Sequence, residues 1–420
     1  MKYVLIGAGS RGTIYGSWAH EHGIEITAIA EIRPDRLSEA AKAWNVPTDR
    51  CFTDAAVLFS LGKIADAAII ATMDRDHYPH VMAALDCGYD ILLEKPISPD
   101  PAECLKIEEK ANALGRKITV CHVLRYTNFW GALKDLIDSQ ELGKIVAIKH
   151  SENIGNFHMA HSFVRGNWRN DTLSSPIILQ KSCHDLDILL WLTGAHCTKV
   201  AAFGSLTYFK ESNAPAGSTD RCWNCPAADN CRFEAKKCYL PTLGTWPTDV
   251  VCLEQTEAAL DDALKTGPYG RCVFRCDNNV CDHMSIILEF DNNVTATFSL
   301  TAQTGPCHRE IRIMCEDGEI LADDGKRQIL IRKHVSSPAD TFEERIINVR
   351  TNSSGHGGGD AGIMEEFTAS LCASRQTKSA ISASVESHMM AFAIEKARNT
   401  GTVVSLDAFR KELKQGVSHA

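Results

Sequence analysis

The sequence predicts a chain of α/β and α+β parts: first a doubly wound parallel sheet, then an open, mostly antiparallel sheet with helices. Three observations support this prediction. Short apolar runs alternate with helical patterns between residues 2 and 120. A glycine-rich turn follows the first apolar run. From about residue 146 onward, alternating segments follow one another through hairpin turns, which is typical of antiparallel sheets.

Composition and charge narrow the class of protein. The chain has 420 residues, of which 44% are hydrophobic and 23% charged, so it is globular rather than disordered. The formal net charge of −9 and the lack of a basic run argue against nucleic acid or a membrane surface as a partner. No stretch approaches the roughly 18 apolar residues of a membrane span. Since no secretory signal is recognisable either, we expect a cytoplasmic protein.

The first part, residues 1–122, reads as repeated β-α units. Strands are expected at Lys2–Ile6, Ile24–Ala30, Ala67–Ala71, Ile91–Leu93 and Lys117–Val120. Helices are expected at Arg11–His22, Arg36–Trp44, His77–Cys87 and Pro99–Leu114. Successive units of this kind form a parallel sheet with helices on both faces.

The second part, residues 123–420, has a different pattern and carries a cysteine-rich insert at about residues 210–282. Strands are expected at Val146–Asn153, Val200–Tyr208, Ser285–Phe290, Val294–Thr301, Glu310–Cys315, Gln328–Lys333 and Arg345–Val349. Helices are expected at Asn128–Gln140, at Cys183–Leu192, and from Ile363 to about Arg398. The turns Phe290–Val294 and Cys315–Glu319 indicate hairpins.

A G-x-G-x-x-G turn joins the first strand to the first helix. It comprises Gly7, Gly9 and Gly12, with Ser10 and Arg11 between the last two. The first glycine permits a tight turn, the second lets backbone approach a pyrophosphate, and the third lets the helix pack on the strand. The helix N-terminus then offers amide groups to phosphate oxygens. In this context the motif predicts a Rossmann-type dinucleotide site at the N-terminus.

Glu31 stands at the end of the second strand, about 20 residues past the glycines, where a carboxylate binds ribose hydroxyls. That carboxylate would repel a 2′-phosphate, so NAD is expected in preference to NADP. Arg33, two residues on, is the feature that would tolerate NADP.

Three motifs together resemble the Gfo/Idh/MocA family of sugar and cyclitol dehydrogenases. They are the glycine fingerprint, Glu94-Lys95-Pro96 after a late strand, and Cys183-His184-Asp185-Leu186-Asp187 in the second part. The resemblance implies a Rossmann domain followed by an open-sheet domain, and dimers or tetramers formed through that sheet. It also implies a small carbohydrate substrate.

The resemblance places Lys95 beside the nicotinamide and the substrate hydroxyl, where an ammonium can stabilise alkoxide character. In the family this Lys-Pro bond is often unusual, and Pro96 permits a cis bond. His184 matches the catalytic histidine, whose neutral imidazole suits removal of a hydroxyl proton. The family often has an aspartate four residues earlier. This chain has Gln180 there, followed by Lys181, which we consider as a second catalytic cation or polar contact.

Other segments match family binding positions. Glu94, Thr72 and His77 are expected on the cofactor side, and Arg125 and Tyr126 at the substrate or nicotinamide end. The further substrate candidates are His158, His161, Arg165, Trp168, Gln180, His356 and Asp360. Tryptophan with arginine and histidine suits a sugar, whose ring face stacks and whose hydroxyls need hydrogen-bond partners. An alternative is that His158 and His161 join His184 around a metal.

The insert holds four cysteines at close spacing: Cys222, Cys225, Cys231 and Cys238. The two cysteines of one Cys-x-x-Cys pair, together with two further thiols, can complete a tetrahedral metal site. A structural zinc is our first interpretation and an iron–sulfur cluster the second. Cys272 or Cys276 would be able to replace Cys238, and free thiols are the alternative.

The sequence therefore predicts an NAD-dependent oxidoreductase that transfers a hydride between a sugar or glycoside hydroxyl and nicotinamide. Three alternatives stay open. One is an NAD-recycling enzyme that cleaves glycosides by oxidation at C3 followed by elimination. The others are a cyclitol dehydrogenase and a non-catalytic sugar or nucleotide sensor.

Overall fold

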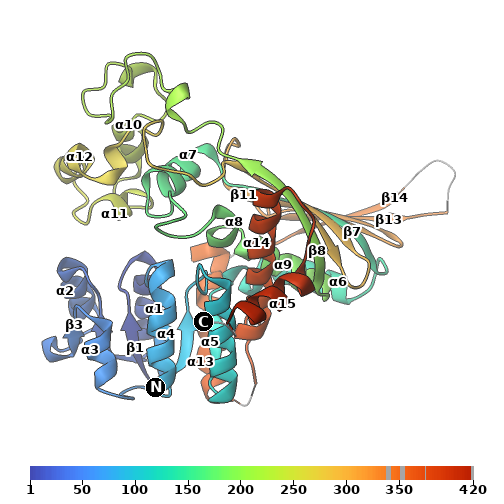
Figure 1. Cartoon of the computed structure of the whole chain (residues 1–420), viewed down its shortest axis with the longest axis horizontal. Helices are drawn as coiled ribbons and strands as arrows, with labels where there is room; N and C mark the ends of the chain where they lie inside the picture. The colour runs from blue at the N-terminus through green and yellow to red at the C-terminus, as the bar shows by residue number, and fades with distance from the viewer. Residues whose placement is uncertain (337–341, 351–354, 374, 418–420) are drawn as a thin grey trace.

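The N-terminal part folds into the predicted parallel sheet with helices on both faces (Figure 1). A computed structural model of the chain describes residues 1–336, 342–350, 355–373 and 375–417. The strands are β1 (Lys2–Ile6), β2 (Glu25–Ala30), β3 (Cys51–Phe52), β4 (Ala67–Ile70), β5 (Asp90–Leu93) and β6 (Ile118–Val120). The helices are α1 (Ser10–Glu21), α2 (Pro34–Ala43), α3 (Ala55–Ser60), α4 (His77–Asp86) and α5 (Pro101–Ala113).

The order of these strands determines where a ligand binds. In the described residues the order is β3-β2-β1-β4-β5-β6, and β1 pairs in parallel with both β2 and β4. The direction of strand order therefore reverses between β1 and β4. A crevice opens outside the carboxyl ends of strands at such a point, which here is the edge of Gly7 and Thr72.

The C-terminal part builds one large sheet in the order β14-β13-β12-β11-β7-β10-β9-β8-β15. Its strands are β7 (Ile145–Asn153), β8 (Cys197–Ser205), β9 (His283–Phe290), β10 (Thr295–Thr301), β11 (His308–Cys315), β12 (Gly318–Asp323), β13 (Gln328–His334), β14 (Phe342–Asn348) and β15 (Val404–Ser405). Among the described strands, β7 and β10 pair in parallel and the other neighbours are antiparallel. The sheet is thus mostly antiparallel, as predicted.

Helices cover one face of this sheet and leave much of the other open (Figure 1). The longer ones are α6 (Asn128–Asp138), α9 (Cys183–Thr193), α14 (Ile381–Thr400) and α15 (Leu406–Val417). Helix α13 (Gly359–Leu371) lies on the N-terminal part instead. The alternation of β9 and β10 buries every second side chain. On the covered face, α14 packs on the neighbouring strand β8 and on α9. On the opposite face Phe203, Ile287 and Ile346 are exposed by 74%, 59% and 57%.

The long C-terminal helix expected from Ile363 to Arg398 is instead two helices, α13 and α14. Between them the chain extends beside β6, where Val120 N donates to Ser379 O and Ala380 bridges to Thr119. Helix α13 packs back against the N-terminal sheet, and its Phe367 shares a core with Tyr3. The expected strand at Val200–Tyr208 lies three residues earlier, as β8. Strands β3, β12 and β15 and helix α15 were not predicted.

The cysteine-rich insert folds into short helices, and the described strands of the large sheet all lie outside it. They are α10 (Ala235–Tyr239), α11 (Thr248–Val251) and α12 (Glu257–Thr266), which follow α7 (Asn156–His158) and α8 (Ile177–Gln180) along the chain. In Figure 1 the insert lies beyond the carboxyl ends of the N-terminal strands, across from α2. None of the described helices is long and apolar enough to cross a membrane.

Candidate active site

The glycine turn has the geometry that a phosphate needs. Gly7 has φ +90°, and a Cβ there would lie 2.6 Å from Ala71 O. A Cβ on Gly12 would lie 1.9 Å from Gly7 O, so α1 packs against the turn only with glycine there. The first heavy atom that a Cβ on Gly9 would meet is Arg36 Nη1, at 3.4 Å. The loop therefore leaves the backbone accessible at the start of α1. The Arg36 guanidinium lies nearby, which the sequence analysis did not predict.

Glu31 lies above this turn, at the carboxyl end of β2. Its Oε2 accepts a hydrogen bond from Ala8 N at 2.7 Å, and its Oε1 accepts one from Arg33 N at 2.9 Å. The Arg33 guanidinium turns away to Asp35, with Nη2 2.5 Å from Oδ2. The carboxylate is thus fixed beside the loop while the neighbouring cation is already paired.

Arg11 and Glu94 form an ion-pair network that ties α1 to α13. Arg11 Nε lies 2.7 Å from Glu94 Oε1, and Arg11 Nη2 lies 2.6 Å from Asp360 Oδ1. Tyr15 donates to the same Glu94 oxygen at 2.7 Å, and His356 Nδ1 lies 3.0 Å from Asp360 Oδ2. Burial raises the pKa of Glu94, but Arg11, Lys95 and Tyr15 together outweigh that effect and hold it below its usual range. The Arg11 and Asp360 side chains, which were expected to bind ligands, form an ion pair with each other here.

The turn after β5 fixes Lys95. The Lys95-Pro96 bond is cis, as the sequence permits. His77 is 1% exposed, and its ring nitrogens lie 2.6 Å from Pro96 O and 3.1 Å from Thr72 O. It therefore supports the turn with both ring nitrogens, and its expected place on the cofactor side stays a prediction. Thr72 stays at the crevice edge, beside Gly7.

Lys95 and Gln180 connect the two parts of the chain. Lys95 Nζ donates to the backbone oxygen of Gln180 at 2.9 Å. The Gln180 side chain is buried and bonds Trp168 O and Ser174 Oγ. Gln180 was expected to bind substrate with its side chain, but it is the Gln180 backbone that acts here, by orienting the Lys95 ammonium.

His184 begins helix α9 opposite Lys95. It is 8% exposed, and its buried Nδ1 has no hydrogen-bond partner among the described residues. Burial, and then the positive charge of Lys95, holds the pKa of His184 well below its usual range. His122 packs edge-on against it, with ring centroids 5.7 Å apart. The imidazole is therefore neutral at physiological pH, as a proton acceptor must be.

Lys181 belongs to a buried network of charges behind His184. Its Nζ lies 3.2 Å from Glu152 Oε1, and Arg309 pairs with both Glu152 and Asp185. Burial lowers the pKa of Lys181, but Glu152, Cys307 and Asp185 together outweigh that effect and raise it above the usual range. Lys181 is thus a protonated cation. Sequence reasoning missed Glu152 and Arg309 because single charged residues on strands β7 and β11 carry no motif.

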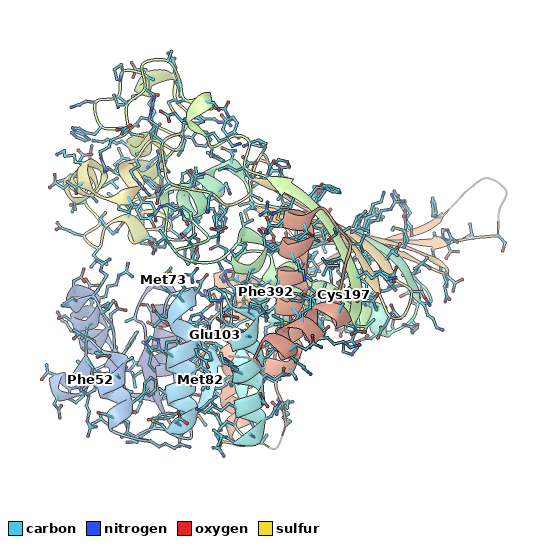
Figure 2. The ribbon with its side chains drawn as sticks, viewed as in Figure 1. Phe52, Met73, Met82, Glu103, Cys197 and Phe392 are labelled. Carbon is cyan, nitrogen blue, oxygen red and sulfur yellow. The ribbon has the colours of Figure 1, made fainter. Side chains whose placement is uncertain are left out.

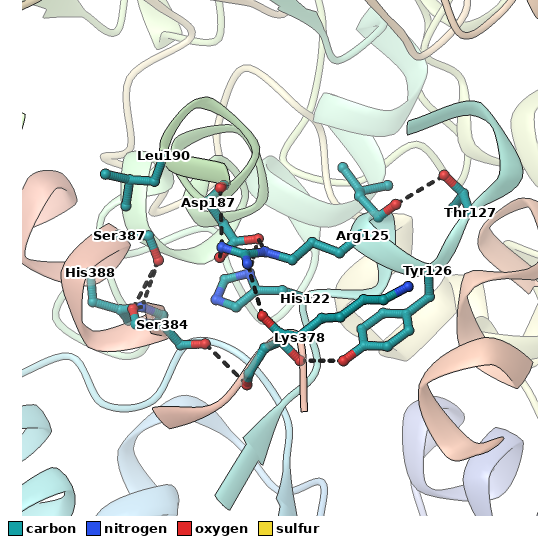
Figure 3. A network of polar contacts seen from close by, with 12 residues as sticks. His122, Arg125, Tyr126, Thr127, Asp187, Leu190, Lys378, Ser384, Ser387 and His388 are labelled. Carbon is teal, nitrogen blue, oxygen red and sulfur yellow. Dashed lines mark hydrogen bonds and ion pairs between the residues drawn. The ribbon is translucent and has the colours of Figure 1, made fainter. Parts of the chain in front are cut away.

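Arg125 and Tyr126, expected to hold substrate, stabilise the fold instead (Figure 3). Arg125 is 6% exposed and forms a bidentate pair with Asp187, at 2.6 and 2.7 Å. Tyr126 OH lies 2.7 Å from Glu366 Oε2 and 2.9 Å from Ser379 Oγ. The polar groups of both side chains therefore bind to α9, to α13 and to the segment before α14, and hold these three parts together.

The polar run before His184 divides between two roles. Arg165 is 1% exposed and donates to Arg271 O and Phe233 O, both at 2.7 Å, so it anchors the insert and not a substrate. His161 does the same, since its Nδ1 lies 3.1 Å from Tyr239 OH. His158 packs edge-on against Trp246, with ring centroids 5.3 Å apart. Burial, and then the charge of Lys181, hold the pKa of His158 well below the usual range.

Trp168 links the two parts of the chain at the crevice. Its Nε1 donates to Asp74 Oδ1 at 3.3 Å, and Ser175 Oγ donates to the other Asp74 oxygen at 2.7 Å. Met73, next to Asp74, is labelled in Figure 2 at the edge of the N-terminal domain that faces the insert. The indole nitrogen is therefore engaged between domains, and only the half-buried ring is left to meet a ligand.

The cysteine segment does not present a preformed ligand set. Among the described residues, the group of metal-ligating side chains whose ligand atoms lie within 4.8 Å of one another is His308, Glu310 and Asp323. In the part of the chain that the structure describes, no three of the four predicted thiols lie mutually within that range, and neither do His158, His161 and His184. Burial raises the pKa of Cys272, and Cys231 and Cys225 add to the rise, so Cys272 lies near the predicted group.

Comparisons with known proteins agree with this geometry. Residues 1–122 match the model described as oxidoreductase family, NAD-binding Rossmann fold, and residues 130–321 match the GFO/IDH/MocA C-terminal domain. The chain belongs to the Gfo/Idh/MocA family of oxidoreductases. The family resemblance stated from the three motifs is confirmed, and so is the fold class.

Relatives in this family include dehydrogenases of cyclic polyols. A putative oxidoreductase YteT of Bacillus subtilis is 22% identical over 370 residues, covering 82% of each chain. An inositol 2-dehydrogenase of Pseudarthrobacter chlorophenolicus is 29% identical over 290 residues, covering 67% of this chain and 79% of its own. A scyllo-inositol dehydrogenase of Lactobacillus casei, solved with NAD(H) and scyllo-inositol, has a TM-score of 0.66 at 17% identity and covers 97% and 99% of the two chains.

Proposed function

We propose that the chain is an NAD-dependent dehydrogenase that oxidises a secondary hydroxyl of a sugar or cyclitol. The observation that carries this proposal is the buried Nδ1 of His184, which has no hydrogen-bond partner among the described residues. Burial and the charge of Lys95, at the carboxyl edge of the parallel sheet, lower the pKa of this histidine. The relatives that act on inositols support the choice of a cyclic polyol.

In the proposed reaction, the substrate hydroxyl lies between Lys95 and His184. Lys95 donates a hydrogen bond to the hydroxyl oxygen and stabilises the negative charge that develops there. His184 accepts the hydroxyl proton, which its lowered pKa keeps it free to do. NAD, when bound, accepts the hydride from the same carbon. The backbone oxygen of Gln180 keeps the ammonium in place between turnovers.

NAD rather than NADP is the proposed cofactor. Glu31 is fixed at the end of β2, while the Arg33 guanidinium is paired with Asp35 and so is not free for a 2′-phosphate. The Arg36 guanidinium beside Gly9 is placed to meet a pyrophosphate oxygen.

An NAD-recycling enzyme that cleaves glycosides is the second candidate. Two neighbouring residues favour it. Gln180 stands where the family often has an aspartate four residues before the histidine, and the next residue, Lys181, carries a positive charge. To test both, the protein is purified without added cofactor, its bound nucleotide is measured, and it is mixed with NAD and a panel of hexoses, inositols and glycosides. Accumulation of NADH supports the dehydrogenase. Retained NAD and cleavage of a glycoside without NADH support recycling, and neither outcome with any substrate favours a sensor.

We also propose that the chain forms homo-oligomers through the open face of the large sheet. Exposed apolar side chains on that face, with Phe203 and Ile287 among them, surround a concavity of about 820 Å³. An apolar face of this kind is unfavourable in water and is stabilised when a second copy covers it. Sedimentation of wild type and Phe203→Glu tests this: the variant is expected to dissociate, and an unchanged assembly contradicts the proposal.

A further inference from the structure

Two buried histidine rings from different parts of the chain contact each other. His122 follows β6 of the N-terminal sheet and His184 begins α9, and their rings pack edge-on with centroids 5.7 Å apart and planes at 85°. Neither ring nitrogen of His122 has a hydrogen-bond partner among the described residues, nor has Nδ1 of His184. Because buried polar atoms are nearly always paired, three unpaired nitrogens on two touching rings point to a function rather than to packing.

The histidine on another side of His122 shows how a structural ring is held here. His388 of α14 also packs edge-on against His122, with centroids 5.7 Å apart. Its Nε2 accepts a hydrogen bond from Ile97 N at 2.9 Å, and its Nδ1 lies 2.7 Å from Ser384 O. Both nitrogens of His388 are therefore engaged with backbone, so this ring is not available to receive a proton. Of the three rings, the unpaired nitrogens belong to His184 and His122.

A carboxylate lies beside His122. Asp187 Oδ2 is 4.0 Å from His122 Nδ1, and Arg125 holds the same carboxylate in a bidentate pair at 2.6 and 2.7 Å. Figure 3 shows His122 beside the Arg125–Asp187 pair, with His388 nearby. Asp187 is one helical turn after His184 on α9, so the base and the carboxylate are fixed on one rigid element. His122 thus contacts the ring of the first and lies near the oxygen of the second.

The electrostatic surroundings of the two rings differ. Burial lowers the pKa of His122 to about 4, although the Asp187 carboxylate opposes that effect. Burial, and then the charge of Lys95, lower the pKa of His184 well below the usual range. A proton is therefore less costly on His122, beside a carboxylate, than on His184. The other groups that act on the pKa of His122 are Arg125, Lys95 and Glu94.

We propose that His122 relays the substrate proton away from His184. In this scheme the neutral His184 ring carries its own proton on Nδ1 and accepts the hydroxyl proton on its other nitrogen. In the same step the Nδ1–H bond breaks and a new N–H bond forms on His122, through one bridging water or a small rotation of the rings. Asp187 stabilises the imidazolium. The proton passes to water when the product leaves, so one proton is released for each NADH formed. This inference rests on the proposed function and adds to it the fate of the proton.

The first test replaces His122 with phenylalanine, which keeps a ring in the same place and removes both nitrogens. In His122→Phe, kcat for NADH formation is expected to fall about 10²-fold, the low end for a group that assists proton transfer. KM and the affinity for NAD should stay as in wild type. The control is His161→Phe, which removes a buried histidine whose Nδ1 faces Tyr239 OH, and it should keep the wild-type kcat. A wild-type kcat in His122→Phe overturns the proposal.

The second test needs wild type alone, so it decides the question even where His122→Phe fails to fold. The rate of NADH formation in a single turnover is measured in mixtures of H2O and D2O. When two protons move in one step, the rate follows a curve against the deuterium fraction, whereas a single moving proton gives a straight line. A curve in wild type supports the relay, and His122→Phe should turn it into a straight line. A straight line in wild type overturns the relay.

These outcomes also separate the relay from the proposed function. NADH formation by wild type with a straight line, or with an unaffected His122→Phe, removes the relay and leaves the dehydrogenase. If wild type forms no NADH with any substrate of the panel, both proposals fail.

Discussion

At the scale of single residues, two side chains at the crevice owe their chemistry to their surroundings. His184 is neutral because it is buried beside a cation, and Lys95 points into the crevice because the backbone oxygen of Gln180 holds it. Neither property is readable from residue type. Histidine in the sequence suggests a base, but the unpaired Nδ1 and the lowered pKa show why this one is ready to accept a proton.

The lowered pKa of His184 predicts an unusual pH profile. A base must be deprotonated, so activity is present above its pKa and is lost as pH falls through it. Because the pKa is held well below the usual histidine range, kcat/KM for oxidation should stay flat as pH falls through about 6.5 and decline only at lower pH. The residual activity of His184→Ala should lack this acid limb, while that of His158→Gln should keep it. A limb centred near 6.5 in wild type would contradict the assignment.

Glu31→Ala tests the choice of cofactor. The variant loses the carboxylate beside the loop, so affinity for NAD should fall by about tenfold, as expected for one charge-assisted hydrogen bond. Affinity for NADP should fall less or should rise, because the repulsion of a 2′-phosphate is relieved. Calorimetric titration with both nucleotides measures this. Equal losses for both would show that Glu31 does not select the cofactor.

At the scale of elements, the sequence predicted best where local physics dictates the structure. The G-x-G-x-x-G turn between β1 and α1 was predictable because only glycine fits at Gly7 and Gly12. The break between α13 and α14 was not, because it depends on pairing with β6, which lies far away in the sequence. The roles of Arg125 and Arg165 were misjudged for the same reason. Their partners Asp187 and Phe233 O come from distant segments, and an arginine in a motif-rich region was taken to face a ligand.

The insert carries a prediction of its own, the proposed structural metal. Protein prepared without a chelator is expected to contain about one zinc ion or iron–sulfur cluster per chain. Cys222→Ser should lower that content and destabilise the insert, whereas Cys372→Ser, on an exposed cysteine outside the insert, should not. Elemental analysis decides the question. A folded wild type without metal would show that the thiols are free.

At the scale of the whole molecule, buried histidines couple folding to pH. Burial lowers the pKa of His122 and of His161 from 6.5 to about 4, and that of His388 to about 3. The unfolded chain therefore binds more protons than the folded chain below about pH 6.5, and stability falls with pH down to about 4.

This coupling is measurable at a single residue. As pH falls from about 7 to about 5, each such histidine should lower the free energy of unfolding by about 2 kcal/mol. Both ring nitrogens of His122 are buried without hydrogen-bond partners among the described residues, and Nδ1 lies 4.0 Å from Asp187 Oδ2, so His122→Leu is expected to fold. Urea unfolding of the variant should show a pH dependence that is smaller by that amount. An identical dependence in variant and wild type would contradict the buried neutral state of His122.

The most direct test of the account compares wild type with Lys95→Ala and His184→Ala for NADH formation on the best substrate of the panel, with NAD affinity measured in parallel. The two residues come from different domains and serve one proton transfer, so each single variant should lose about 10²–10⁴-fold in kcat/KM. The double variant should lose little more than either single variant. NAD affinity should be unchanged, since the glycine turn is intact. Near-full turnover by either variant, with normal NAD binding, would contradict the assignment of that residue and make the Lys181 cation the next group to examine.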